Sequence, residues 1–419
     1  MMRLFYSVLW HLALPLFFLR TLLRSRKEPG YRQDIGQRLG MGPQQPHRPT
    51  IWIHAVSVGE TRAAAPLVTA LRARWPRHRI LMTQMTATGR RTAQDLYGDQ
   101  IDIAWLPWDL PWAQRRFLQR WKPQIGIVME TEIWPNLLRE CRRAGIPVLL
   151  ANGRLSERSA ARYARAPEFV RDALSCFTFV IAQTAADARR FASLGASRPT
   201  VAGNLKFDIG PPRELVEIGA HWRQRLDARR VLLLASTREG EEALLLDALL
   251  PRLPADVLIA LVPRHPQRFD DVGALIKARG LSVCRRSAGM LPAADTQVWL
   301  GDAMGEMFAW YALADLALIG GSWLPLGGQN LIEACAVGCP VLIGPHTFNF
   351  AQVTEDAIAA GAALQASDVT SAASEASRLL AAPATLKAMA DAGRAFAQAH
   401  RGATERTMAL IEPLLRDAT

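Results

Sequence analysis

The stretch Ile51–Leu67, IWIHAVSVGETRAAAPL, decides the fold that we predict for this chain. It opens with an apolar run that is typical of a buried strand, turns through Ser57–Gly59 and enters a helix at Glu60. A strand that passes through a glycine-containing turn directly into a helix is the first unit of a βα fold. Glu60 then lies at the carboxyl end of a strand, where open α/β sheets bind ligands. On this pattern alone, Glu60 either acts chemically or complements the helix dipole.

The same alternation of apolar runs and helical segments continues toward the middle of the chain. The predicted strands repeatedly end in polar residues, and parallel strands bring such ends together at one edge of a sheet. We therefore expect these residues to line one cleft, although any one of them alone fits a turn or a cap. They are Glu60, Thr86–Arg91, Glu130, Glu132, Asn152, Arg154 and Lys206.

A second alternating half begins after the segment Ile209–Pro212, IGPP, which is the best candidate for a linker. We predict an α/β protein with two Rossmann-like domains that face a central cleft, at residues 48–208 and 213–419. The last helix of the second domain is also able to pack back on the first domain. A chain of 419 residues is long enough for two such cores.

The second half contains two glycine pairs, Gly320-Gly321 and Gly327-Gly328, next to predicted helix starts. Backbone N–H groups in such loops can bind a phosphate. Arg264, at a strand end, can bind the same group. Glu333 can accept hydrogen bonds from a ribose, as in dinucleotide folds, or can serve as a capping residue.

The amino-terminal segment Leu4–Leu23 is strongly apolar and is followed by basic residues, among them Arg24, Arg26 and Lys27. Basic residues beside an apolar helix favour the cytoplasmic side of a membrane and attract anionic lipid. We predict that residues 1–30 form a single membrane anchor with the rest of the chain in the cytoplasm. The alternative is a helix that packs on the first domain or lies in the membrane interface.

The overall composition points to an anionic partner. The formal net charge is +12 and the pI is about 10.1, which suits nucleic acid, phospholipid head groups or a phosphorylated substrate. The five cysteines suggest free thiols in a reducing compartment. No Asp-x-Asp triplet occurs, so we predict no metal site.

Nine segments, in order, resemble the bacterial 3-deoxy-D-manno-octulosonic acid (Kdo) transferases. They are VSVGET, TATG, METEIWPN, ANGRLS, GNLKFD, PRHPQRF, GDAMGEM, GGQNLIEA and GPHTFNF, and they extend over nearly the whole chain. The resemblance implies a GT-B fold, CMP-Kdo as donor and a lipid A precursor (lipid IVA) as acceptor, with no cofactor. It also implies a role in lipopolysaccharide biosynthesis at the cytoplasmic face of the inner membrane of a Gram-negative bacterium.

The resemblance also assigns roles to individual residues. It makes Glu60 the general base and has Glu130 or Glu132, together with Lys206, support charge in the transition state; which of the two carboxylates faces the cleft stays open. Gln329 departs from the pattern, because many relatives have His there. The positions matched to CMP binding are Pro263, Arg264, Met304, Gly305, Glu306, Asn330, Leu331, Ile332 and Glu333.

The chemistry of the residues agrees with an inverting glycosyl transfer. A carboxylate can take the proton from an attacking sugar hydroxyl. CMP is already a good leaving group, so cationic and backbone donors suffice on its side. Two other readings are a nucleotide-sugar epimerase of the same scaffold and a basic nucleic-acid-binding protein. The apolar amino terminus argues against the epimerase, and the scattered basic residues, without a recognised motif, argue against the nucleic-acid binder.

Overall fold

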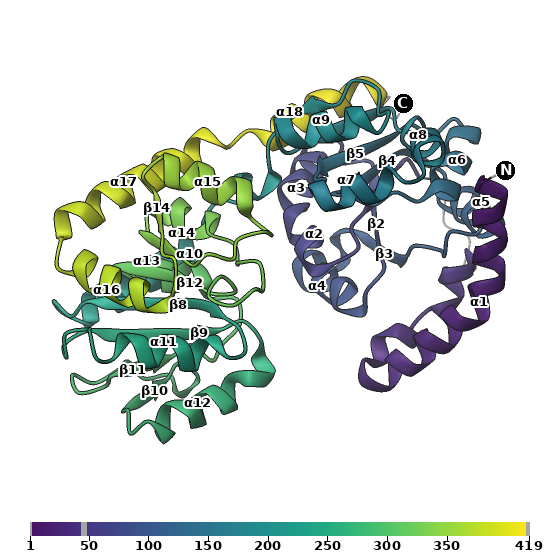
Figure 1. The fold of residues 1–419 in the computed structure, drawn as a ribbon. Coiled ribbons are helices and arrows are strands. Elements are labelled where there is room, and N and C mark those ends of the chain that lie inside the picture. The colour runs from purple at the N-terminus through teal and green to yellow at the C-terminus, as the bar shows by residue number, and fades with distance from the viewer. Residues whose placement is uncertain (1, 43–47, 416–419) are drawn as a thin grey trace. The chain divides into compact units, whose positions relative to one another are not determined.

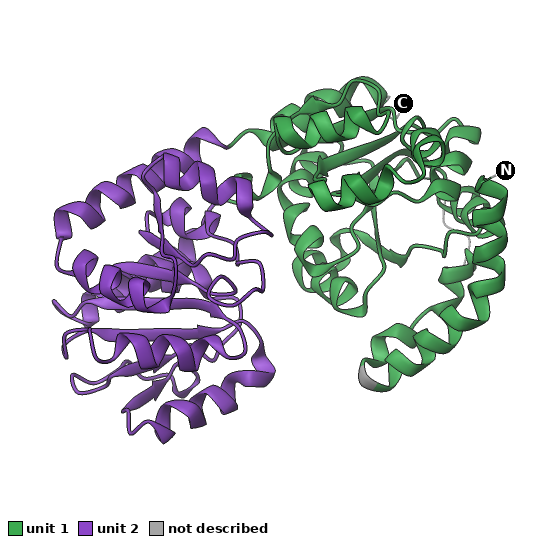
Figure 2. Cartoon of the chain, viewed as in Figure 1, with its two compact units in different colours: residues 1–209, 401–419 green, residues 210–400 purple. Residues whose placement is uncertain are grey.

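The computed structural model describes residues 2–42 and 48–415, and the chain divides into two compact units (Figure 1). Unit 1 comprises the chain up to Ile209 and again from Arg401, whereas unit 2 is Gly210–His400 (Figure 2). The chain therefore leaves unit 1 within the predicted linker segment. The final helix, α18 (Ala403–Ile411), belongs to unit 1, where it contacts α3 (Ala65–Arg74).

Unit 1 is built on a seven-stranded sheet with the order β3-β2-β1-β4-β5-β6-β7. Every pairing in it is parallel, so all seven strands end at the same edge. The strands are β1 (Thr50–His54), β2 (Arg79–Gln84), β3 (Asp102–Trp105), β4 (Pro123–Met129), β5 (Val148–Gly153), β6 (Phe179–Ala182) and β7 (Thr200–Val201).

Both faces of this sheet are covered, as the alternation along β1 shows. Ile51 and Ile53 pack with Leu67 and Leu71 of α3 and with Ile411 of α18. Trp52 points to the opposite face and packs with residues of α5 (Pro111–Trp121) and α6 (Pro135–Arg143). A strand that is buried on both faces is apolar throughout, and this explains the continuous apolar run in the sequence.

The helix that follows β1 differs from the prediction in its start and its continuity. It begins at Val58, because Ser57 accepts a hydrogen bond from the backbone N–H of Glu60 as the N-cap. It also breaks after Ala63, and α3 begins anew with Pro66 in its first turn. Similarly, α4 begins at Ala87, within the segment Thr86–Arg91 that we expected to follow a strand and line the cleft, with Thr86 as N-cap.

The remaining helices of unit 1 follow the strands in the expected alternation. They are α2 (Val58–Ala63), α4 (Ala87–Tyr97), α7 (Glu157–Tyr163), α8 (Pro167–Leu174) and α9 (Ala185–Ser193). Short 3₁₀ helices complete the unit: η1 (Pro29–Arg32), η2 (Ile35–Leu39), η3 (Gly98–Gln100), η4 (Leu205–Asp208) and η7 (Glu412–Leu414).

Unit 2 contains a second parallel sheet, with the order β10-β11-β9-β8-β12-β13-β14. Its strands are β8 (Val231–Thr237), β9 (Leu258–Pro263), β10 (Val283–Arg285), β11 (Val298–Leu300), β12 (Leu316–Ile319), β13 (Val341–Ile343) and β14 (Ala363–Gln365). Its helices are α10 (Arg213–Arg225), α11 (Glu241–Leu249), η5 (Pro266–Arg268), α12 (Phe269–Ala278), η6 (Arg286–Ala288), α13 (Met307–Leu313), α14 (Ile332–Val337), α15 (Ala351–Ala359), α16 (Val369–Leu380) and α17 (Pro383–Ala399). The predicted pair of Rossmann-like folds is therefore confirmed.

The amino-terminal helix α1 (Met2–Lys27) has two apolar sides. One side packs on unit 1, where Trp10, Phe17 and Phe18 contact the cluster around Trp108. The other side is exposed, and Leu12 is 71% exposed. By length and composition α1 is able to cross a membrane. It is a candidate membrane anchor that is also packed against its own domain (Figure 1).

Candidate active site

The carboxyl edge of the unit 1 sheet brings together the acidic residues that the sequence singled out. β1 lies between β2 and β4, so the strand order reverses at the β1–β4 pair. Such a switch point opens a crevice at the strand ends, where doubly wound sheets bind ligands. Glu60 follows β1 through a short turn, and Glu130 and Glu132 directly follow β4.

The carboxylate of Glu60 is held by the turn that carries it. Its Oε2 accepts a hydrogen bond from the backbone N–H of Val56 at 2.8 Å, and its Oε1 accepts one from the Ser57 hydroxyl at 2.9 Å. The capping role that the sequence left open is therefore present. A carboxylate has about four lone-pair sites, so each oxygen still has room for a second donor. The local bonds fix the orientation of Glu60 without exhausting its capacity as an acceptor.

The surroundings of Glu60 favour its protonated form. Burial raises the pKa of Glu60 to about 7, and repulsion by the carboxylates of Glu130 and Glu132 contributes to the increase. The hydrogen bonds from Val56 and Ser57 oppose the shift. Burial likewise raises the pKa of Glu132. A carboxyl group with a pKa near neutrality is matched to proton transfer at the pH of a cell.

Lys206 and Asn152 complete this edge. The Lys206 ammonium lies 3.7 Å from the Glu130 carboxylate, and both side chains are about one-fifth exposed. Asn152, at the end of β5, accepts a hydrogen bond from the backbone N–H of Leu205 at 3.0 Å and so holds the 3₁₀ turn that carries Lys206. Glu130 and Asn152 both have positive φ, at 55° and 54°. Such strained backbone in residues other than glycine clusters at functional sites.

The switch point of unit 2 lies between β8 and β12, and a buried carboxylate joins the two strand ends there. Glu241 accepts hydrogen bonds from the backbone N–H groups of Arg238 (2.8 Å) after β8, and of Gly321 (2.7 Å) and Trp323 (3.0 Å) after β12. The strand ends approach so closely that a Cβ on Gly320 would lie 2.4 Å from the Ser236 carbonyl oxygen. Sequence reasoning missed Glu241, because its partners lie far along the chain.

This arrangement corrects our prediction for the glycine pairs. The N–H of Gly321 is bound to Glu241, that of Gly320 to the Ala235 carbonyl, and that of Gly328 to the Gly321 carbonyl. These three N–H groups hold the loops together and are therefore not directed at a phosphate. Glycine is needed here for two other reasons. It lets the backbones approach closely, as at Gly320, and it allows a positive φ, as at Gly321, where φ is 71°.

The residues predicted to bind CMP all follow strands of the unit 2 sheet. Pro263 ends β9, and the N–H of Arg264 binds the Thr237 carbonyl at the end of β8. Met304, Gly305 and Glu306 follow β11. Asn330 and Leu331 precede α14, which begins at Ile332. Because the sheet is parallel, all of these residues lie toward its carboxyl edge.

The side chains of Glu306, Asn330 and Glu333 already have partners in this structure. The Glu306 carboxylate makes two hydrogen bonds to Arg286, at 2.9 and 3.1 Å. The Nδ2 of Asn330 donates to Glu333 at 3.2 Å, and its Oδ1 accepts from the N–H of Ile332. The latter bonds orient Glu333 at the first turn of α14. Within the described residues, no group of three or more His, Cys, Asp or Glu side chains is placed to hold a metal ion.

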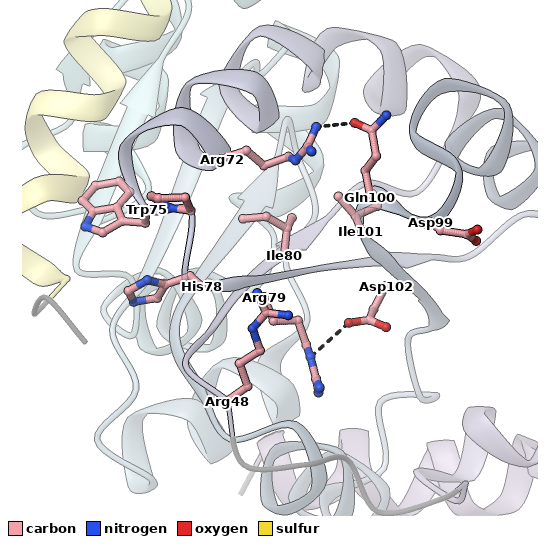
Figure 3. Close-up of a pocket in the computed structure, with 11 residues that line it drawn as sticks. Arg48, Arg72, Trp75, His78, Arg79, Ile80, Asp99, Gln100, Ile101 and Asp102 are labelled. Carbon is pink, nitrogen blue, oxygen red and sulfur yellow. Dashed lines mark hydrogen bonds and ion pairs between the residues drawn. The ribbon is translucent and has the colours of Figure 1, made fainter. Parts of the chain in front are cut away.

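A separate pocket of about 430 Å³ lies at the opposite, amino-terminal edge of the unit 1 sheet (Figure 3). Arg79 and Asp102, at the first positions of β2 and β3, line it side by side and form a 3.1 Å ion pair. Arg72 is hydrogen-bonded to Gln100. This pocket includes none of the residues that sequence analysis selected, because those follow the carboxyl ends of the strands.

Comparisons of the sequence with known proteins identify one family. Residues 33–209 match the family model described as 3-deoxy-D-manno-octulosonic-acid transferase (kdotransferase). A 3-deoxy-D-manno-octulosonic acid transferase of Bordetella pertussis is 45% identical over 96% of both chains. One of Haemophilus influenzae is 36% identical over 99% of both. A glycosyltransferase structure from Rickettsia africae is similar in fold, with a TM-score of 0.60 and 12% identity, over 89% of this chain and 100% of that one.

The role of Glu241 as the connection between β8 and β12 is testable by stability. Glu241→Ala leaves two buried N–H groups and a partly buried one without an acceptor, and we expect the free energy of unfolding to fall by about 3–5 kcal/mol. Urea denaturation followed by tryptophan fluorescence measures it. Glu239→Ala, which removes an exposed carboxylate two residues away, is the control and should change the value by less than about 0.5 kcal/mol. Equal stabilities of the two variants would contradict this role.

Proposed function

The chain belongs to the 3-deoxy-D-manno-octulosonic acid (Kdo) transferase family, and on that premise we propose that it transfers Kdo from CMP-Kdo to lipid IVA, a lipid A precursor, in lipopolysaccharide biosynthesis. In this proposal unit 1 binds the acceptor and unit 2 binds the CMP moiety of the donor. Membership of this family favours glycosyl transfer over epimerisation and over nucleic-acid binding.

The observation that carries the proposal is the acidic group at the switch point of unit 1. Glu60 is held in a fixed orientation, and burial together with two neighbouring carboxylates brings its pKa to about 7. Like charges nearby destabilise the ionised form of a carboxylate, and this does not help a carboxylate whose only role is to cap a helix. A general base gains a pKa that matches the working pH.

The proposed reaction is an inverting displacement at the anomeric carbon of Kdo. Glu60 takes the proton from the acceptor hydroxyl as the oxygen forms its bond to that carbon. The bond from the anomeric carbon to the phosphate oxygen breaks, and CMP leaves with the electron pair. Lys206, with Glu130 or Glu132, supports charge around the reacting centre, and Arg264 faces the phosphate as a cationic donor.

We also propose that the protein associates with the membrane through one side of α1. The inner side of α1 is packed on unit 1, and its outer side exposes Leu12 and Leu16, at 71% and 68%. A helix that is bound along one side to a polar domain cannot cross the bilayer without taking that domain with it. We infer that α1 lies in the cytoplasmic interface of the inner membrane with its outer side inserted, aided by the basic residues that follow.

The first test concerns the base. Glu60→Gln should fold normally and bind CMP but lose about 10²–10⁴-fold in kcat, measured as transfer to lipid IVA. In the parent enzyme, kcat/KM should rise with pH through about 7, because only the ionised carboxylate accepts the proton. Normal turnover by a folded Glu60→Gln protein would exclude Glu60 as the base.

The same pH profile tests the coupling between the carboxylates. Glu130→Gln removes a repulsive charge, so the pKa of Glu60 should fall and the acidic limb of kcat/KM should move to lower pH. The pH midpoint of the acidic limb is the quantity to compare. The maximal value of kcat/KM is not used, because Glu130→Gln also removes the proposed support of charge in the transition state. Asp99→Asn, an exposed residue at the opposite edge of the sheet, should leave the limb where it is.

The donor site is tested by titration with CMP. Arg264→Ala and Glu333→Ala should each weaken binding about 10- to 100-fold, because each removes a charged hydrogen-bonding group from the proposed site. Isothermal titration calorimetry measures the dissociation constant. Arg252→Ala removes an equal charge from an exposed position that precedes β9 and should bind CMP like the parent. Parent-like affinity in both site variants would mean that unit 2 binds a different ligand.

The membrane proposal predicts that the outer side of α1 drives retention. Leu12→Gln and Leu16→Gln should each reduce partitioning into anionic vesicles about tenfold, since each removes an apolar side chain from the inserted face. Vesicle sedimentation measures the bound fraction. Leu244→Gln changes a leucine of unit 2 that is 40% exposed and should have no effect. If the bound fraction is the same for all three variants, another surface of the protein binds the membrane.

A further inference from the structure

A fully buried carboxylate connects α1 to the acidic turn of unit 1. Asp109 accepts hydrogen bonds from the backbone N–H groups of Asn136 (3.0 Å) and Leu137 (2.8 Å) at the amino end of α6. It accepts a further bond, also 3.0 Å, from the hydroxyl of Tyr6 in α1. Burial raises the pKa of Asp109 to about 6, and the donors, Tyr6 among them, act against this shift. Tyr6 therefore helps to hold a charge that has no access to water.

A second bond from α1 reaches the same helix end. The hydroxyl of Ser7 donates to Oδ1 of Asn136 at 3.0 Å, and Nδ2 of Asn136 donates to the Asp109 carbonyl at 2.6 Å. Asn136 is 2% exposed, so both groups of its side chain are satisfied inside the protein. Two consecutive residues of α1 thus bind the pair that fixes the amino end of α6.

The amino end of α6 is also the end of the turn that carries Glu130 and Glu132. β4 ends at Met129 and α6 begins at Pro135, so only five residues separate them. Within this segment Glu130 has positive φ, and the ring of Trp134 lies 6.3 Å from that of Trp10 in α1. A short, strained turn depends on its two anchors, and one of them is bound to α1.

We propose that α1 is a positioning element of the acceptor site, in which Tyr6 and Ser7 act through Asp109 and Asn136 to fix the turn that bears Glu130 and Glu132. The inference rests on the proposed role of that turn. In consequence, the helix that holds the protein at the membrane is also required for the geometry of the reacting groups, even when no membrane is present.

The alternative is that α1 only anchors the protein, and another contact of the same helix provides the matched comparison. The indole N–H of Trp112, in α5, donates to the imidazole of His11 at 3.2 Å. This bond also joins α1 to unit 1, but it reaches neither Asp109 nor the end of α6. The His11 ring is also bonded to the backbone carbonyl of Ser7 within α1, at 2.7 Å, but not to the Ser7 hydroxyl. His11→Leu therefore reports on the seating of α1 and leaves the side-chain bonds of Tyr6 and Ser7 in place.

The experiment compares Tyr6→Phe, Ser7→Ala and His11→Leu in the full-length protein in detergent micelles, with CMP-Kdo and lipid IVA as substrates. Tyr6→Phe should lower kcat roughly tenfold, because one hydrogen bond to a buried charge is lost and the reacting groups are aligned less often. Ser7→Ala should lower kcat in the same direction but less. The KM for CMP-Kdo should not change, because the variants leave unit 2 intact. His11→Leu should retain the parent kcat.

The outcomes separate this inference from the proposed function. Equal kcat values for Tyr6→Phe and His11→Leu would overturn the inference, as would a Tyr6→Phe protein whose loss is restricted to the KM for CMP-Kdo. Glu130→Gln and Glu132→Gln are measured in the same assay. If both retain the parent kcat, the proposed role of the turn fails and the inference fails with it. If either loses turnover while Tyr6→Phe does not, only the inference fails.

Discussion

The parallel direction of the strands is the constraint on which the rest of the structure depends. In each sheet every pairing is parallel, so all strand ends and the loops after them meet at one edge. The strand order reverses between β1 and β4 and between β8 and β12, and doubly wound sheets bind their ligands beside the strand ends at such points. Glu60, Glu130 and Glu132 lie at the first of these points. Glu241 joins the loops at the second.

Buried carboxylates have two different kinds of surroundings in this chain. Asp109 accepts from two backbone N–H groups of α6 and from the Tyr6 hydroxyl of α1, and Glu241 accepts from N–H groups that follow β8 and β12, so each carboxylate connects separate parts of the fold. Glu60 accepts two hydrogen bonds from its own turn and meets like charges from β4. Backbone donors stabilise a carboxylate, whereas neighbouring carboxylates make it a stronger base. Burial alone therefore does not distinguish a structural carboxylate from the one that we propose as a base.

Helix α1 illustrates how one segment can satisfy two environments. Its inner side carries aromatic residues and hydroxyl groups that contact unit 1, and its outer side exposes leucines. Both sides are apolar, so the segment looks like a simple anchor from composition. The contacts of Tyr6 and Ser7 with Asp109 and Asn136 give the inner side a structural role within the domain.

The sequence by itself determined the alternation of strands and helices, the linker after Ile209 and the strand-end positions of Glu60, Glu130 and Lys206, because apolar runs and turn residues are local signals. It did not reveal β14, and the N–H groups of Gly320, Gly321 and Gly328, which it offered to a phosphate, are bonded within the protein instead. Only the tertiary structure decided which N–H groups are already bonded and which acids are buried together. Glu241 and Gly321 are 80 residues apart, and Tyr6 and Asp109 are 103 apart. Such partners meet only because the order of the strands and the packing of the helices bring them together. A local sequence pattern does not specify that order, so it cannot predict these contacts.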